Sequence, residues 1–497
     1  MREDISTILS DVGGFYKIIA VFIPLPLCVA LYNQEWLCAG SFLLIFFYFL
    51  GFGNLLNSLP QYQKYTRISS ALASVAFAWL TIGIVFGIPY LICSNISFTD
   101  ASFEGMAGWT STNFSFLSAT TEETAELTSS LLFWRAYMQW IGSFTILSVL
   151  VALVKGSRYS SHRQLAHERR QEHIFMSLKS VVRQIFPYYI IFSFCAWCAI
   201  VLSGVPLLDS VYLMFSSVST GGFSPHPGNI MYYNSVTLEF VLICIMIMAA
   251  LPFPLYVALY FKQGFKALLE EKQIILLLLL ICATAVIVTY DIVSGFAVEP
   301  MEDGDPVGLW SAVRYGFFMC VASATTTGFW NTTIVGWTDV GAILIMLLIF
   351  IGGSTMSVAG GIKLRRVLLW FSGVTWWISQ VFAPPHAKVP LFFEGKRIGT
   401  QGASSEISKN TIYIVSSALL IGFVAILLVH AQPQDGVLPV IFDAISAYGT
   451  CGITLGYVNV DMPTGSKWLA ILLMYGGRLE VIPIIMLFIH LFSRTEK

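Results

Sequence analysis

Charged side chains are scarce in this sequence. They make up 11% of its 497 residues, against about 25% in a typical soluble domain. The two signs nearly cancel, with a formal net charge of -1, so the basic excess expected of a nucleic-acid-binding protein is missing. Hydrophobic residues make up 56% of the chain. These values indicate an integral membrane protein without a nucleic-acid partner.

Motifs for catalysis are also missing. The seven His residues form no His-Glu-x-x-His pair and the chain has no Gly-x-Ser-x-Gly run, so neither a catalytic metal site nor an activated serine is indicated. Two of the nine cysteines form Cys195-Ala-Trp-Cys198 inside an apolar run. Cysteines in that setting are expected to pack rather than to bind metal or change redox state. We therefore expect no enzyme activity and no organic cofactor in this chain.

Long apolar runs are what the sequence has instead. A helix crosses the bilayer in about 20 residues, and the first run lacks the short apolar core and cleavage site of a signal peptide, so we expect it to be retained. The sequence predicts an all-α polytopic membrane protein with about ten transmembrane helices. The predicted spans lie near residues 15–32, 36–56, 68–93, 131–154, 186–206, 236–261, 273–294, 339–372, 411–430 and 467–492.

Basic residues mark one side of the membrane. They follow alternate predicted spans, which is the positive-inside pattern and places both termini in the cytoplasm of a multi-pass protein of the cytoplasmic membrane. The opposite loops are acidic or neutral, as at Glu299, Glu302, Asp303 and Asp305, so that face is expected to attract cations. The basic residues are Lys64, Arg67, Lys155, Arg158, Arg163, Arg169, Arg170, Lys262, Lys266, Lys272, Lys363, Arg365, Arg366, Lys388, Lys396 and Arg397.

Four short polar segments repeat between pairs of predicted spans. Each begins with an aromatic residue, has Ala or Ser at its fifth position, and carries hydroxyl residues just before its eleventh. The eleventh residue is Gly in three copies and Asn113 in the first. The segments align without gaps as FEGMAGWTSTNF (103–114), YLMFSSVSTGGF (212–223), FMCVASATTTGF (318–329) and FDAISAYGTCGI (442–453).

Each repeat is interpreted as helix, re-entrant segment, helix. Non-helical backbone at membrane depth is tolerated only where protein buries it or where it lines a watery cavity. Four copies around one central cation pore would aim backbone carbonyls inward, where they replace the water around a dehydrated cation. Ordinary helix contacts through small residues are the alternative, which four in-register copies disfavour. The predicted filter residues are Thr110, Ser111, Thr112, Asn113, Ser219, Thr220, Gly221, Gly222, Thr325, Thr326, Thr327, Gly328, Thr450, Cys451 and Gly452.

The sequence resembles the Trk/Ktr/HKT superfamily of potassium transporters, and within it the TrkH-type pore subunit. The resemblance implies a pseudo-fourfold pore in each monomer, a homodimer, and a cytoplasmic TrkA-type ring that binds the regulatory nucleotide. It rests on FTDASFEGMAG (98–108), LLFWRAYMQWIG (131–142), VSTGGFS (218–224), ATTTGFWNT (324–332), GGSTMSVAGGIKLRRV (352–367) and GGRLEVIPIIMLF (476–488).

The run IGGSTMSVAGGIK (351–363) should break a helix near mid-membrane, because two glycine pairs flank small hydroxyl residues. In the resembling family this loop lies under the filter as a gate; a Gly-rich packing face is the alternative. Lys363 is expected to anchor the end of the gate by snorkelling. The predicted gate residues are Gly352, Gly353, Ser354, Thr355, Gly360, Gly361, Lys363 and Arg478.

Arg478 lies in the last predicted span, where a charge is costly unless it faces the bundle interior or a cavity. The resemblance places an Arg here in the conduction path, as a barrier that interacts with the gate loop. The alternative is a structural ion pair with Glu480 or Asp443.

The predicted function is channel-like translocation of a monovalent cation, potassium first, as the pore subunit of a Trk-type uptake system. Asn113 departs from the glycine of the other copies, and Asn tolerates positive φ better than most residues, but its amide near the axis favours appreciable sodium permeation. A sodium-permeable or weakly selective transporter of the same fold, and an ion-coupled secondary transporter, symporters included, are the alternatives. Four repeats in the same sense argue against the inverted repeats usual in secondary transporters.

The chain is divided by these features into two N-terminal helices (1–66), four pore repeats and a cytoplasmic connection at 383–410. The connection contains a turn signal, Glu394-Gly395, between apolar runs, which fits a hairpin able to dock the regulatory ring. The basic loop 155–173 is the other candidate docking surface, and a plain charged linker is the alternative. The pore repeats are 67–155, 156–262, 263–382 and 411–497.

Overall fold

The computed structural model describes residues 2–60, 68–117, 127–161, 174–253, 255–256, 271–294, 308–333, 337–384 and 389–492. Most of the basic residues named above, and all of the acidic loop residues, either lie outside the described residues or have side chains that are not described. Most of the loop 155–173 also lies outside the described residues. The elements are helical apart from one two-stranded hairpin.

Six described helical spans are long and apolar enough to cross a membrane. They are Ile5–Tyr32 (α1, Arg2–Ala20, with α2, Pro24–Tyr32), Trp36–Asn57 (α3), Ser69–Cys93 (α4, Ile68–Val85, with α5, Ile88–Cys93), Ser180–Leu202 within α8 (Ile174–Leu202), Lys272–Val293 (α13) and Thr400–Ala431 (α17). A seventh is the pair α19 (Thr464–Leu479) and α20 (Val481–Phe492), which bends by 106°. The other three predicted spans correspond to α7 (Ser129–Ser161), α10 (Val236–Ala249) and α15 (Asp339–Ile351) with α16 (Leu364–Val381).

Several predicted spans differ from the observed helices. Helix α8 begins at Ile174 and α17 at Thr400, both before the predicted starts at 186 and 411, and α10 ends at Ala249, before the predicted end at 261. The largest differences are in three other spans. The first begins about ten residues earlier than predicted, as α1, and is interrupted before Pro24, which starts α2, as expected for a proline in a first helical turn. The span 467–492 is not one helix, because Glu480 adopts φ 70° between α19 and α20. The span 339–372 is broken by residues 352–363 between α15 and α16, as the glycines predicted.

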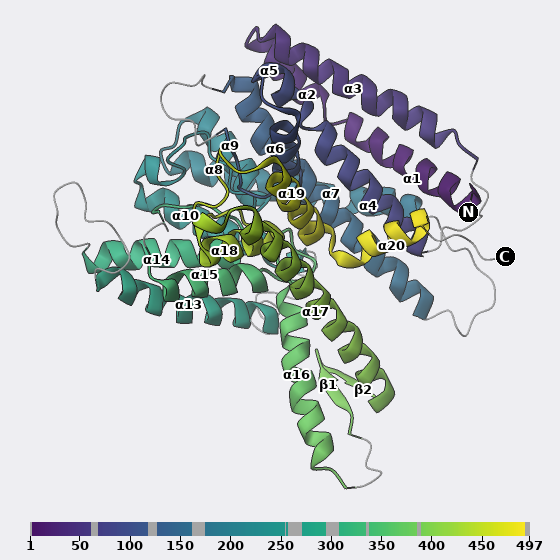
Figure 1. Cartoon of the computed structure of the whole chain (residues 1–497), viewed down its shortest axis with the longest axis vertical. Coiled ribbons are helices and arrows are strands. Elements are labelled where there is room, and N and C mark those ends of the chain that lie inside the picture. Colours follow the sequence, from purple (N-terminus) through teal and green to yellow (C-terminus); the bar gives the residue numbers. More distant parts are fainter. Residues whose placement is uncertain are drawn as a thin grey trace.

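Four shorter helices end at the polar segments, and the longer helices join them in a closed circuit. They are α6 (Phe98–Thr110), α9 (Leu207–Val218), α14 (Leu309–Ala324) and α18 (Val437–Gly449). The helix after each segment packs on the short helix of the next: α7 on α9, α10 on α14, α15 on α18, and α19 back on α6. Helices α1, α2 and α3 lie outside this circuit against α4, α5 and α7 (Figure 1).

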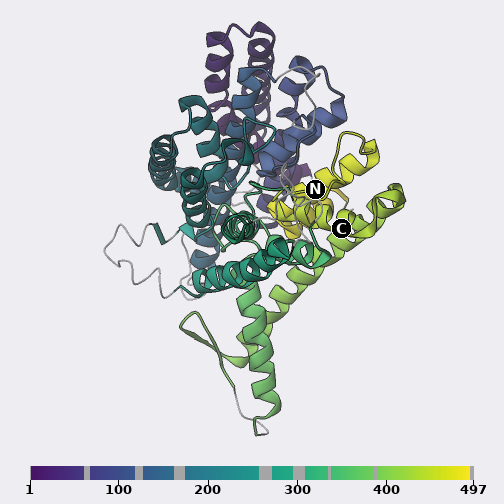
Figure 2. The ribbon, with the colours of Figure 1, turned by 90° about the vertical axis from the view of Figure 1, so that its left-hand side faces the viewer.

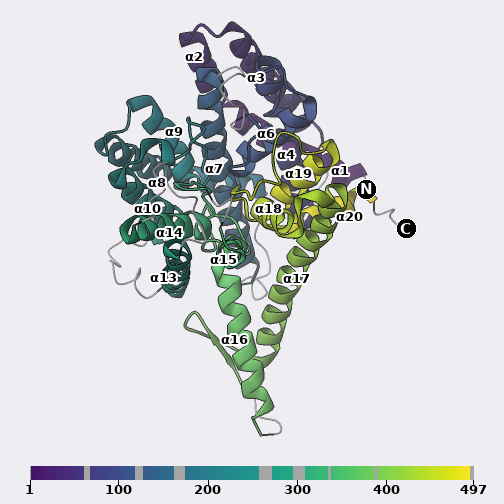
Figure 3. The ribbon, with the colours of Figure 1, turned by 60° about the vertical axis from the view of Figure 1, so that its left-hand side comes forward.

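A stalk formed by α16, α17 and the hairpin projects from the rest of the molecule in every view (Figures 1, 2 and 3). Strands β1 (Leu391–Phe393) and β2 (Lys396–Ile398) pair antiparallel through a turn in which Glu394 and Gly395 have φ 49° and 70°, the backbone of a two-residue hairpin turn. The predicted hairpin is therefore confirmed, and the described fold is otherwise helical, as predicted. Leu391 and Phe393 pack on Leu369 of α16 and Ala403 of α17.

Candidate functional site

The four short helices end in the same backbone turn. The N–H groups of Thr112, Gly221, Thr327 and Cys451 donate to the carbonyls of the fifth residues of the segments, Ala107, Ser216, Ala322 and Ser446, at 2.8, 2.8, 2.8 and 3.0 Å. The residue before each donor is left-handed: Ser111, Thr220, Thr326 and Thr450 have φ of 58°, 51°, 53° and 53°. This is the Schellman cap that ends many helices, here without the usual glycine. The internal repeat in the sequence therefore corresponds to a repeated structure.

The residues after these turns meet one another. A Cβ added to Gly222 would lie 2.2 Å from the carbonyl oxygen of Thr327, and one added to Gly328 would lie 1.9 Å from that of Cys451. A Cβ on Gly452 would lie 2.2 Å from the backbone nitrogen of Asn113. The Asn113 Cβ closes the circuit, 3.1 Å from the place of a Cβ on Gly222. We call the four sets 110–113, 219–222, 325–328 and 449–452 the ring; no side chain fits at Gly222, Gly328 and Gly452.

Asn113 takes a different backbone conformation from the glycines that align with it. Gly222, Gly328 and Gly452 have φ of 79°, 80° and 81°, whereas Asn113 does not adopt positive φ. The expectation that Asn would replace glycine by tolerating positive φ is therefore wrong. Its side chain lies at the ring, where Nδ2 donates to the carbonyl oxygen of Gly328 at 2.6 Å.

Helix dipoles add to the electrostatics of the ring. The C-termini of α6, α9, α14 and α18 all end there, and each carries a partial negative charge of roughly half an elementary charge. Carbonyl and hydroxyl oxygens surround the same place, with Thr110 and Thr112 joined through their hydroxyls at 2.9 Å and Thr325 and Thr327 at 2.8 Å. This arrangement favours a cation.

Side chains that the sequence analysis missed hold the ring. Gln139 of α7 donates from Nε2 to the Gly221 carbonyl at 2.8 Å, and one turn later Ser143 donates to the Ser219 carbonyl at 2.7 Å. Asn229 donates to the Gly222 carbonyl at 3.2 Å. The signal available was the spacing of Gln139 and Ser143, two polar residues four apart in a mostly apolar run, which places them on one helix face.

Two buried carboxylates hold the chain that leaves the ring. Glu104 of α6 accepts from the Ser115 hydroxyl at 2.8 Å and from the Phe116 N–H at 2.7 Å. At the aligned position of α18, Asp443 accepts from the Thr454 hydroxyl at 2.5 Å and the Leu455 N–H at 2.9 Å. In the first and fourth segments, a carboxylate at the same aligned position thus holds the backbone that follows the ring by accepting hydrogen bonds from it.

Residues 352–363, which we call the 352–363 loop, lie against the left-handed residues of the ring. The Gly360 N–H donates to the Thr326 hydroxyl at 2.6 Å, and the Thr220 hydroxyl donates to the Val358 carbonyl at 3.2 Å. A Cβ on Gly360 would lie 2.3 Å from the Thr450 Oγ1. Gly352 and Gly361 enter and leave the loop at φ 68° and 75°. The predicted gate residues are therefore brought together with the predicted filter residues.

The loop is also fixed from its other side. The Ser354 N–H donates to the Ala250 carbonyl at 3.1 Å, and the Thr355 N–H donates to Gln273 Oε1 at 3.0 Å. Gly353 packs closely on Ala359 within the loop. Lys363 is 8% exposed and donates to the Ala359 carbonyl, so the expectation that it snorkels as an anchor is wrong.

Arg478 joins the loop to the ring. Its Nη1 donates to the Val358 carbonyl at 2.8 Å, and its Nη2 donates to Ser143 Oγ at 2.7 Å and to Ser111 Oγ at 3.2 Å. The ion pair of Glu480 is with Arg366 at 2.7 Å, and Asp443 holds backbone as described above. The Arg478 guanidinium thus binds the loop and the ring, and it does not form the alternative ion pair with Glu480 or Asp443.

The chain is similar to known cation transport proteins over nearly its whole length. The family model of the TrkH cation transport proteins matches residues 41–495. An uncharacterized cation transporter of Methanocaldococcus jannaschii is 27% identical, with 99% of this chain and 97% of that protein covered. The Trk system potassium uptake protein TrkH of Escherichia coli is 23% identical, with 95% of each covered. The crystal structure of the potassium transporter TrkH from Vibrio parahaemolyticus superposes with a TM-score of 0.82 at 21% identity over 99% of this chain and 100% of that one. The chain therefore belongs to the TrkH family and is a multi-span cation transport protein, not an enzyme.

Proposed function

We propose that this chain conducts monovalent cations, potassium first, through the ring. The observation that carries the proposal is the fourfold recurrence of one turn, whose carbonyls and hydroxyls meet at the ends of four helix dipoles. Such oxygens replace the hydration shell of a passing cation. The residues 67–155, 156–262, 263–382 and 411–497 are then four pseudo-symmetric helix, re-entrant segment, helix repeats around one pore, with the two helices of residues 1–66 outside them.

The 352–363 loop and Arg478 are the gate in this proposal. The loop covers the left-handed turn residues of the ring, and the Arg478 guanidinium supplies a positive charge at the same place. A cation cannot pass while the loop and the guanidinium hold these positions. The contacts correspond to a closed pathway, which opens when the loop leaves the ring.

Orientation and partners complete the proposal. The positive-inside pattern places both termini and the stalk in the cytoplasm of a cell whose cytoplasmic membrane holds the protein. A homodimer and a TrkA-type nucleotide-binding ring are the proposed partners. The stalk is the proposed docking surface because it connects directly to the 352–363 loop. The guanidinium of Arg365, two residues after the loop, pairs with Glu394 of the hairpin turn at 2.7 Å, so a partner bound to the hairpin could act on the loop.

Selectivity is the part of the proposal that Asn113 affects. Its amide engages the Gly328 carbonyl, so one oxygen of the ring is less available to a cation. We therefore propose potassium as the main substrate, with appreciable sodium permeation. A sodium-permeable or weakly selective transporter is the second candidate.

Cation replacement tests the proposal. The purified protein in liposomes takes up tracer rubidium while potassium, sodium, rubidium or lithium competes from outside. We expect potassium and rubidium to compete best, and the substitution Asn113→Gly to increase the preference for potassium over sodium. Equal competition by potassium and sodium in both proteins would support the second candidate. No uptake of any cation by folded protein from which residues 354–359 of the gate have been deleted would contradict cation conduction.

A further inference from the structure

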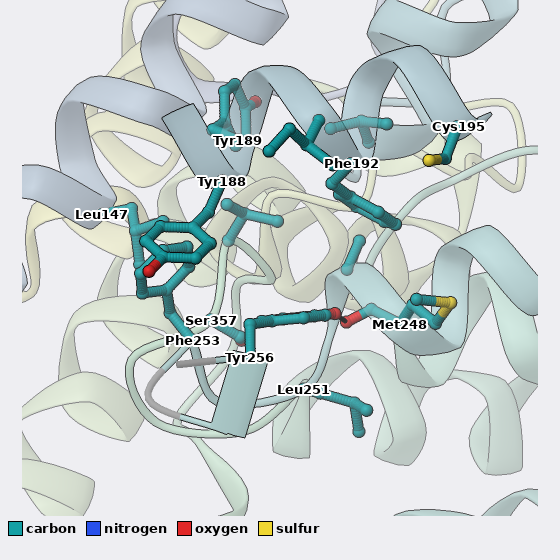
Figure 4. Close-up of a pocket in the computed structure, with 14 residues that line it drawn as sticks. Leu147, Tyr188, Tyr189, Phe192, Cys195, Met248, Leu251, Phe253, Tyr256 and Ser357 are labelled. Atoms are coloured by element: carbon teal, nitrogen blue, oxygen red, sulfur yellow. Dashed lines mark hydrogen bonds between the residues drawn. The ribbon is translucent and has the colours of Figure 1, made fainter. Parts of the chain in front are cut away.

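An apolar cavity of about 490 Å³ lies behind the 352–363 loop. Its walls come from α7, α8, the end of α9, α10 and the residues that follow α10, and Ser357 and Val358 of the loop form one side (Figure 4). Val218, also in the wall, directly precedes Ser219 of the ring. The cavity therefore touches both the ring and the loop that covers it.

Three hydroxyl groups in the described walls already have partners inside the protein. The Tyr189 hydroxyl donates to the Trp140 carbonyl at 3.1 Å, and the Ser357 hydroxyl donates to the Ser354 carbonyl at 2.6 Å. The Tyr256 hydroxyl donates to the Met248 carbonyl. A polar ligand would find few groups to bind, and apolar cavities of this kind exclude water and accept apolar molecules.

The mouth of the cavity opens at the middle of a membrane span. Ile191 and Cys195 line it from the centre of the span Ser180–Leu202, and both are exposed, Ile191 to 60%. Met248 of α10, 41% exposed, lines it from the facing helix. The medium at that depth is the hydrocarbon of the bilayer. The molecules that reach this mouth are thus lipid tails.

We propose that the cavity binds a lipid acyl chain, which enters between α8 and α10 and holds the 352–363 loop against the ring. The volume lies within the range of about 300–1,000 Å³ usual for ligand sites. The Val358 carbonyl is held by Arg478 and Thr220, so a chain packed behind Val358 favours these contacts. It also fills the space into which the loop would move on leaving the ring, since close-packed interiors have few other voids.

Bound lipid should therefore lower cation flux, and this effect rests on the proposed function. Binding of the acyl chain in the cavity does not depend on the proposed function and can be measured separately. Cys195 makes both measurable. A matched control is Cys282, which is exposed on α13 and does not line the cavity. Two proteins are compared, each retaining only one of these two thiols, with Cys28, Cys93, Cys198 and Cys244 replaced by alanine.

Occupancy is measured first, on protein in detergent. A small apolar maleimide labels the thiol while palmitic acid is added, with butyric acid as the short-chain control. Labelling of Cys195 should slow by about fourfold when palmitic acid is at three times its Kd, with Cys282 unaffected. Equal rates at Cys195 with and without palmitic acid would overturn the acyl-chain site, whatever the protein transports.

The effect on the gate is measured in liposomes. Dodecyl methanethiosulfonate, which attaches a twelve-carbon chain as a mixed disulfide, should lower tracer rubidium flux at Cys195 and not at Cys282, and dithiothreitol should restore it. Full labelling of Cys195 with unchanged flux would overturn the link to the loop, as would an equal loss at Cys282. Labelling at Cys282 alone would show that protein, such as a second copy, covers the mouth. Flux missing before labelling contradicts the proposed function instead.

Discussion

At the scale of single residues, the unusual choice is a hydroxyl residue where a helix cap favours glycine. Thr220, Thr326 and Thr450 adopt φ of 51–53°, a conformation that is rare for β-branched residues and costs about 1–3 kcal/mol each. The hydroxyls of Thr220 and Thr326 bind the 352–363 loop. The strain is therefore retained at the positions where a side chain contacts the 352–363 loop.

Thr326→Gly should separate stability from gating. Glycine accepts the left-handed backbone without strain, a gain of about 1–3 kcal/mol. The buried Gly360 N–H, however, loses its acceptor at a cost of about 1–3 kcal/mol, so the free energy of unfolding should change little. The same loss should increase resting rubidium flux. Thermal unfolding in detergent measures the stability, and tracer flux in liposomes measures the resting flux. A variant that is less stable and equally closed would contradict this interpretation of Thr326.

Arg478→Ala should raise resting flux in folded protein. The substitution removes the positive charge and the hydrogen bonds to Val358, Ser111 and Ser143. A hydrogen bond to a charged group contributes about 1.5–3 kcal/mol, so the open fraction should rise by about tenfold or more. Arg366→Ala is the control, because Arg366 pairs with Glu480 instead. Unchanged flux in well-folded Arg478→Ala would assign the residue a structural role.

Sequence identified the ring and the loop better than it identified individual conformations. Hydroxyl and glycine residues recurring in register were enough to locate the ring, because a repeated turn needs a repeated sequence. The backbone of Asn113 was predicted wrongly, since its conformation depends on contacts with Gly328 and Cys451 from other repeats. Burial of Lys363 was missed for a similar reason, as its carbonyl partner lies in the folded loop.

At the scale of elements, local chemistry predicted the breaks that glycine or a turn produces. The hairpin follows from Glu394-Gly395, and the interruption of α15 and α16 follows from the glycine pairs. The 106° bend between α19 and α20 was not predicted. It occurs at Glu480, whose left-handed backbone accompanies an ion pair with Arg366 of α16, and a long-range contact of this kind leaves no local pattern.

Gly360→Ala should open the gate without deleting it. The added methyl group would lie 2.1 Å from the Gly449 carbonyl oxygen and 2.3 Å from Thr450 Oγ1, so the loop has to move away from the ring. Resting rubidium flux should approach that of a deletion of residues 354–359, which we expect to conduct with poor regulation.

Gly422→Ala is the matched control for this loop substitution. Gly422 lies in α17 with open space around its Cβ position, so its substitution should leave resting flux unchanged. Folded Gly360→Ala or deletion protein that never conducts would contradict the assignment of the loop as a gate.

At the scale of the whole molecule, the described helices form a circuit in which each repeat contacts the next and the last returns to the first. In the proposed function this circuit encloses one pathway at its centre, whereas alternating access requires one part to rock against another around a bound ion. The carboxylates Glu104 and Asp443 beside the pathway accept hydrogen bonds from backbone and hydroxyl groups. These hydrogen bonds hold the backbone that leaves the ring.

The transport mode can therefore be tested by reversal potential. With a potassium gradient across liposomes containing the gate-opened Gly360→Ala protein, current should reverse near the potassium Nernst potential, offset only by sodium permeation. Imposing a pH gradient of one unit should leave that reversal unchanged, because no proton moves with the cation. A proton-coupled symporter would shift its reversal with the pH gradient, and a sodium-coupled one would require sodium for potassium uptake. Either result would replace channel-like conduction with coupled transport, even if the ring still selects potassium.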